Sequence, residues 1–140
     1  DAAERSGKRA IHTHLVASMA RVAVHHGEPI EALDQLTTVI RHYIGAGNVG
    51  NLRVVLLNLV VVLVRYSRFD AAAVIGGFTA TRFTAVTFPE FEPTMAHLRD
   101  VLGEDRFTAL THAGAAMTPL AMAEYAQNQI ADLRAEITST

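Results

Sequence analysis

A thirteen-residue stretch, Leu52 to Val64, is the feature that most constrains the fold. It reads LRVVLLNLVVVLV and is interrupted only by Arg53 and Asn58. It is too apolar for a surface helix and too short for a bilayer crossing, which needs about 20 apolar residues. Its many valines would also suit a buried strand, but the eighteen residues from Val49 to Tyr66 lack a turn signal and are long for a strand. The stretch therefore predicts a central buried helix on which the rest of the chain packs.

Length and composition favour one helical domain. The chain has 140 residues, half of them apolar and 19% charged, so residues 1–140 are expected to form a single domain with its own core. Without cysteine, a disulfide framework and a Cys-based zinc site are excluded, which fits a reducing cytoplasm. The formal net charge of −2 gives no positive field for nucleic acid or an anionic membrane. We therefore expect a cytoplasmic domain that binds neither.

Turn signals divide the chain into about seven helices, which predicts an all-α fold. Gly27 and Pro29 end one helix and start the next. Asp70 is the expected N-cap of a later helix, and Thr118-Pro119 starts the last one. Apolar residues recur at spacings of three and four along most of these segments. The expected helices cover about residues 8–25, 29–44, 49–66, 71–80, 93–102, 104–116 and 119–137.

An internal repeat indicates that these helices stack as hairpins. At an offset of 40 residues, Gly27-Glu28-Pro29 falls on Ser67-Arg68-Phe69, and Ala32 falls on Ala72. Tandem helical hairpins stack as an α-solenoid in which each repeat covers its neighbour's apolar face. The apolar stretch would then lie in the first helix of the second repeat, covered from both sides, which explains its composition.

Catalytic, cofactor and metal motifs do not rise above background. The seven histidines contain neither a His-Glu-x-x-His pattern nor a pair four residues apart. Ser6-Gly7-Lys8 lacks the spacing of a phosphate loop, and the glycines of residues 45–50 are explained as a helix end and a turn. Acidic pairs such as Glu104 and Asp105 suit a helix start. We predict no enzyme activity, no cofactor and no metal.

The candidate interaction surface consists of Arg53, Asn58, Arg65, Tyr66 and Arg68. Arg53 and Asn58 point about 140° apart on a helix, so at most one of them faces the deepest core. A buried unsatisfied amide costs roughly 1 to 3 kcal/mol, so Asn58 is expected to bond the backbone of a neighbouring helix or loop. The alternative for both residues is the lining of a ligand or peptide groove. For Arg65, Tyr66 and Arg68 in the turn that follows, the alternative to a contact surface is a turn that is merely solvated.

Three segments carry a resemblance to a protein family: HHGEPIEALDQLTTVIRHYIGAGN, NLRVVLLNLVVVLVRYSRFDAAAVIGGF and LGEDRFTALTHAGAAMTPLAMAEYA. They resemble the C-terminal helical region of large bacterial, especially mycobacterial, transcriptional regulators. Those proteins are similar in plan to LuxR-type regulators with a signal-transduction ATPase module, some of them fused to an adenylate/guanylate cyclase domain. The resemblance covers about residues 20–130. It implies a tetratricopeptide-like α-solenoid of about seven antiparallel helices that has no nucleotide site of its own.

These observations predict a non-catalytic sensor, scaffold or interaction domain of a multidomain bacterial transcriptional regulator. The chain starts at Asp1 with charged and small residues and no initiator Met, so we expect a piece of a longer protein. The expected partner is another protein or the other domains of the parent chain, with self-association where apolar faces lack cover. The alternative is a small-molecule effector-binding domain with a pocket between the helix of residues 49–66 and the C-terminal helices.

Overall fold

The computed structural model describes residues 29–81, 89 and 91–139, and every regular element in these ranges is an α-helix. This confirms the all-α fold, and the observed bounds lie within two residues of the predicted ones. The helix expected over residues 8–25 lies outside the described residues. The described helices are α2 (Pro29–Gly45), α3 (Val49–Arg65), α4 (Phe69–Thr79), α6 (Phe91–Leu102), α7 (Glu104–Ala115) and α8 (Pro119–Ser139).

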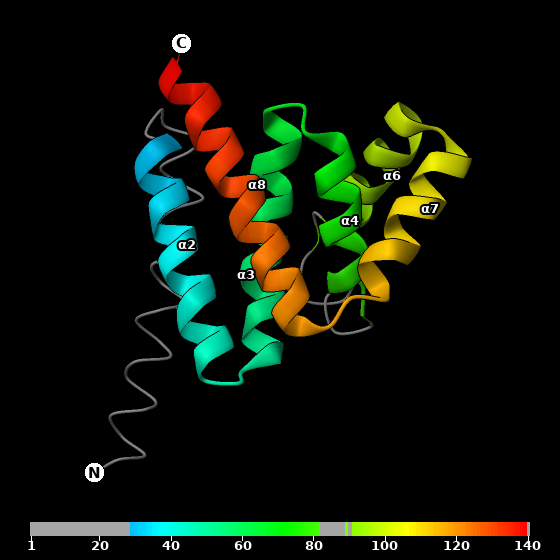
Figure 1. Ribbon diagram of the computed structural model, residues 1–140. Helices are drawn as coiled ribbons and strands as arrows, with labels where there is room; N and C mark the ends of the chain where they lie inside the picture. Colours follow the sequence, from blue (N-terminus) through cyan, green and yellow to red (C-terminus); the bar gives the residue numbers. More distant parts are fainter. Residues whose placement is uncertain (1–28, 82–88, 90, 140) are drawn as a thin grey trace.

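Helix α3 is the central element that the apolar stretch predicted. Ten of its residues are buried, nine of them apolar and the tenth Asn58. It contacts α2, α4 and α6, and Figure 1 shows it between α2 and α4. Because neighbours cover it on several sides, almost its whole circumference can be apolar, unlike the one-sided stripe of a surface helix.

The two turns that flank α3 are built in the same way. Gly47 and Ser67, twenty residues apart, both have positive φ angles, of 69° and 61°. In each turn the next amide donates back into the preceding helix, Asn48 N to Tyr43 O at 2.9 Å and Arg68 N to Leu63 O at 2.8 Å. This is the Schellman arrangement, which reverses the chain directly after a helix. Helices α2, α3 and α4 are therefore successive antiparallel neighbours.

The offset of 40 residues agrees with the positions of α2 and α4. The two helices begin at Pro29 and Phe69, and Ala32 and Ala72 are both fully buried. The first helix of the proposed repeat would fall on residues 8–25, outside the described part of the chain. The agreement therefore concerns the second helix of each hairpin.

Glycines allow α4 and α7 to cross at very short distance. A Cβ atom built on Gly77 would lie 2.1 Å from the carbonyl oxygen of Thr111, and one on Gly114 would lie 1.7 Å from that of Val74. Real side chains do not approach a backbone oxygen so closely, so both positions need glycine. In this pair of adjacent glycines, Gly76-Gly77, it is Gly77 that allows the close approach of α7.

Helix α8, the last of the described helices, packs antiparallel on α2 (Figure 1). Arg134 Nε donates to Asp34 Oδ1 at 2.9 Å, and Arg41 Nε donates to Gln127 Oε1 at 3.0 Å. These contacts are exposed, and an exposed ion pair contributes at most about 1 kcal/mol. The main contribution comes from the buried stripe of α8: Met122, Ala123, Ala126, Ile130 and Leu133.

Candidate functional site

The predicted interaction residues lie in separate places. Arg53 belongs to α3, and its side chain contacts the C-terminal end of α4. Its Nε donates to the carbonyl oxygen of Phe78 at 3.4 Å, and its guanidinium carbon lies 4.9 Å from the centroid of the Phe78 ring. The last four carbonyls of a helix have no partner within the helix, and that of Phe78 is one of them. Arg53 therefore closes the C-terminal end of α4, which is a structural role.

Asn58 is buried, but its hydrogen bond differs from the predicted one. Its Nδ2 donates to the carbonyl oxygen of Val54, one turn earlier in the same helix, at 3.3 Å. The expectation that Asn58 bonds a neighbouring helix or loop is therefore wrong. The physical reason is that the carbonyl four residues back lies on the same helix face, within reach of a short amide side chain. The amide of Asn58 therefore pairs within its own helix.

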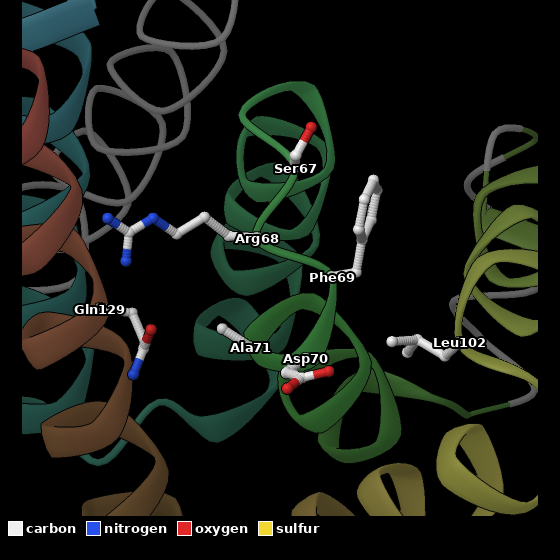
Figure 2. A pocket seen from close by; sticks show the side chains of 7 residues that line it. All are labelled: Ser67, Arg68, Phe69, Asp70, Ala71, Leu102 and Gln129. Atoms are coloured by element: carbon white, nitrogen blue, oxygen red, sulfur yellow. The ribbon is translucent and has the colours of Figure 1, made fainter.

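The other three predicted residues lie together at the turn between α3 and α4. Arg65 is exposed, and Tyr66 is half-buried against the core. Arg68 forms an ion pair with Glu136 of α8, and their side chains are 24% and 60% exposed. Arg68 is the less exposed partner of this pair. Figure 2 shows its side chain extending toward α8.

A pocket of about 320 Å³ lies at this turn, where α4 begins. Figure 2 shows Arg68 and Gln129 on one side, Phe69 and Leu102 on the other, and Asp70 between them. The walls come from three parts of the chain, namely the turn, the end of α6 and the middle of α8. We call it the turn pocket; its lining residues are Ser67, Arg68, Phe69, Asp70, Ala71, Leu102 and Gln129.

Asp70 was predicted as the N-cap of α4, and this prediction is wrong. The N-cap position belongs to Arg68, which makes no side-chain capping hydrogen bond, and Asp70 lies in the first turn. The Asp70 carboxylate instead accepts two hydrogen bonds from Arg106 of α7, one of them from Nε at 3.0 Å. The helix starts two residues earlier than expected because the Schellman turn at Ser67 fixes where the chain reverses.

The charge of Asp70 affects its surroundings. Its hydrogen bond with Arg106 lowers the pKa of Asp70 below its ordinary value. Burial raises the pKa of Tyr125 on α8, and the negative charge of Asp70 adds to that effect. Asp70, one wall residue of the turn pocket, therefore pairs with α7 and its charge influences Tyr125 of α8.

The lining of the turn pocket combines charged, polar and apolar groups. Its two charged residues, Arg68 and Asp70, already have partners in Glu136 and Arg106. The hydroxyl of Ser67 and the amide of Gln129 can donate and accept hydrogen bonds, while Phe69 supplies an apolar surface. Within the described residues, no three His, Asp or Glu side chains gather closely enough for a metal ion.

Of the predicted surface, only Arg68 lines the turn pocket. Phe69, Asp70, Leu102 and Gln129 were not predicted as site residues. The basic turn pointed to the region, but Leu102 and Gln129 lie 34 and 61 residues beyond Arg68 along the chain. Their approach depends on how α6 and α8 pack, for which the sequence carries no local signal.

Comparisons with known proteins do not place the chain in a family. No family model matches it, and neither a curated protein nor a solved structure matches it. Among the described helices, none has both the length and the hydropathy that crossing a bilayer requires. What the molecule itself defines is a helical domain with a pocket of mixed polarity at one turn.

Proposed function

We propose that the chain is a non-catalytic interaction domain of a multidomain bacterial transcriptional regulator. In this proposal it is a tetratricopeptide-like α-solenoid of about seven antiparallel helices in a cytoplasmic regulator of the LuxR type with an ATPase module. The observation that carries the proposal is the surface at the turn between α3 and α4. There Arg65, Tyr66 and Arg68 lie together beside a pocket with charges of both signs.

The mechanism would be conformational. Arg68 joins the turn to α8 through Glu136, and Asp70 joins α4 to α7 through Arg106. Since Glu136 and Arg106 are each 60% exposed, a charged partner can exchange with either pair without first opening the core. Binding at the turn would then shift α8 or α7 relative to α4. A ligand that prefers one arrangement biases the larger protein between states.

The preferred partner is a second domain of the same regulator, with self-association as the other option. Calorimetric titration of the ATPase module into this chain tests it, with a charge exchange at the turn as the informative variant. In Arg68→Glu/Glu136→Arg the internal ion pair can re-form while the charges offered to a partner are inverted. We expect binding to weaken about tenfold or more.

A matched control is Asp34→Arg/Arg134→Asp, which exchanges the exposed pair between α2 and α8 and leaves the Arg68–Glu136 pair in place. It should bind as the wild type does. Equal loss in both variants would mean that the turn is not the contact surface, and absence of wild-type binding would reject the module as partner.

A small-molecule effector domain is the second candidate function, and the turn pocket favours it. The pocket lies directly after α3 and includes residues of α6 and α8, near the place predicted for such a site. Its volume of about 320 Å³ is at the small end of ligand sites. A thermal-shift screen separates the two functions, because a specific metabolite would raise the Tm of the wild type and not of Gln129→Ala. A domain that only binds proteins would respond to no metabolite.

A further inference from the structure

Helix α6 packs its apolar side chains on the rest of the molecule as a narrow stripe, beside ring contacts of His97 with Phe69 and of Arg99 with Phe107. Phe91, Met95, Leu98 and Leu102 follow spacings of four, three and four and so lie on one face. Phe91 and Leu98 are the two buried residues of the helix, while Met95 and Leu102 are half-buried against the core. Each contact of this stripe therefore matters for the position of α6.

Met95 fills a notch in α4 that glycine creates. A Cβ atom at Gly76 would lie 2.8 Å from Met95 Sδ and 2.9 Å from Met95 Cε. The thioether thus packs directly against the backbone of α4. An oxygen added to the sulfur on that side would collide with α4, or would stay buried without a hydrogen-bond donor, which is unfavourable for a polar atom.

We propose that Met95 is an oxidation site whose modification loosens α6 from α4. Hydrogen peroxide transfers one oxygen atom to the thioether: an S–O bond forms, the O–O bond breaks, sulfur is oxidised by two electrons and the peroxide is reduced to water. Exposure favours Met95 over Met122, because Met95 is half-buried whereas Met122 is fully buried; Met117 is half-buried as well. The sulfoxide is polar and no longer fits an apolar contact.

The same stripe connects Met95 to the turn pocket. Leu102, two turns further along α6, is one wall of that pocket. When α6 separates from α4 at Met95, the wall at Leu102 moves with it. Oxidation therefore opens the turn pocket, and this response does not depend on what the turn binds.

The test is peroxide treatment of the whole chain followed by peptide mapping and thermal denaturation. We expect sulfoxide at Met95 before Met122, and a Tm lower by roughly 3–8 °C. Met95→Leu has a similar volume and cannot be oxidised, so it should keep its Tm in peroxide. Met117→Leu retains Met95, so peroxide should lower its Tm as much as it lowers that of the wild type. Methionine sulfoxide reductase should restore the Tm of the oxidised wild type.

Hydrogen exchange on the oxidised wild type gives a readout that needs no variant. Amides of residues 91–102 should exchange faster after oxidation, while those of α2 should not change. The proposal is overturned if Met95 becomes sulfoxide without a change in Tm or in α6 exchange. It is equally overturned if Met95→Leu loses as much Tm as the wild type, or if Met122 is oxidised first.

Discussion

The guanidinium group of Arg53 lies over the ring of Phe78, 4.9 Å from its centroid, and its Nε donates to the carbonyl oxygen of the same residue. One side chain of α3 thus contacts both the ring and the backbone at the end of α4. A polar residue within the most apolar stretch of the chain is explained by this contact. Arg53 therefore connects the central helix α3 to its neighbour α4.

Arg53→Ala should destabilise the fold by about 1–2 kcal/mol, because it removes a cation–π contact and a hydrogen bond to a helix end. Urea unfolding followed by circular dichroism measures the change. Asp132→Ala, on the exposed side of α8, is the control and should stay within about 0.5 kcal/mol of the wild type. If the two variants are equally stable, the contact with Phe78 does not stabilise the fold.

Alanine at either glycine of the α4–α7 crossing should destabilise the protein by about 3 kcal/mol or more, since the added Cβ would overlap a backbone carbonyl. The two variants are Gly77→Ala and Gly114→Ala. Gly45→Ala is the matched control, because a Cβ there meets nothing within 4 Å and alanine is the better helix former. Differential scanning calorimetry should place the control at or above the wild-type Tm. A tolerated Gly114→Ala would contradict the close crossing.

Ser67→Gly should stabilise the fold by up to about 1 kcal/mol. Ser67 has a φ of 61°, which costs a residue with a Cβ atom more than it costs glycine. The reciprocal change, Gly47→Ala in the equivalent turn, should cost about the same amount. Denaturation midpoints of the two variants should therefore move in opposite directions. Movement in the same direction would show that the two turns are not equivalent.

The ion pair of Asp70 and Arg106 should make stability depend on pH in the acid range. The pKa of Asp70 is lowered in the folded protein, so its contribution is present above the unfolded-state pKa of about 3.9. That contribution is lost as the pH falls through the lower folded-state pKa. The stability difference between wild type and Arg106→Ala should thus shrink as the pH falls below the unfolded-state pKa. Denaturation at a series of pH values measures it, and a constant difference would contradict the pairing.

Much of the fold could be predicted from sequence because its signals are local. The caps, the prolines and the three-four spacing of apolar residues define where each helix lies, and Leu52 to Val64 has a composition that only a central helix explains. The N-cap at Asp70 failed because the turn at Ser67, without glycine, gave no sign of where α4 begins.

The site could be predicted only where it is continuous in sequence. The basic turn indicated Arg68, but Gln129 and Leu102 reach the turn pocket through tertiary packing. Asn58 and Arg53 were placed on the candidate surface for their polarity alone. The polarity of Asn58 is explained by its hydrogen bond to the carbonyl oxygen one turn earlier in α3. That of Arg53 is explained by its hydrogen bond at the end of α4.

Site-specific photo-crosslinking from the turn tests the central claim most directly. A benzophenone amino acid replaces Arg65, exposed beside the turn pocket, or Ala113, exposed on α7, in the cell that naturally produces the protein. If the turn is an interaction surface, position 65 should give one discrete crosslinked product, from the parent's own domains or from one partner, and position 113 should not. No product from position 65, or the same products from both positions, would contradict the account.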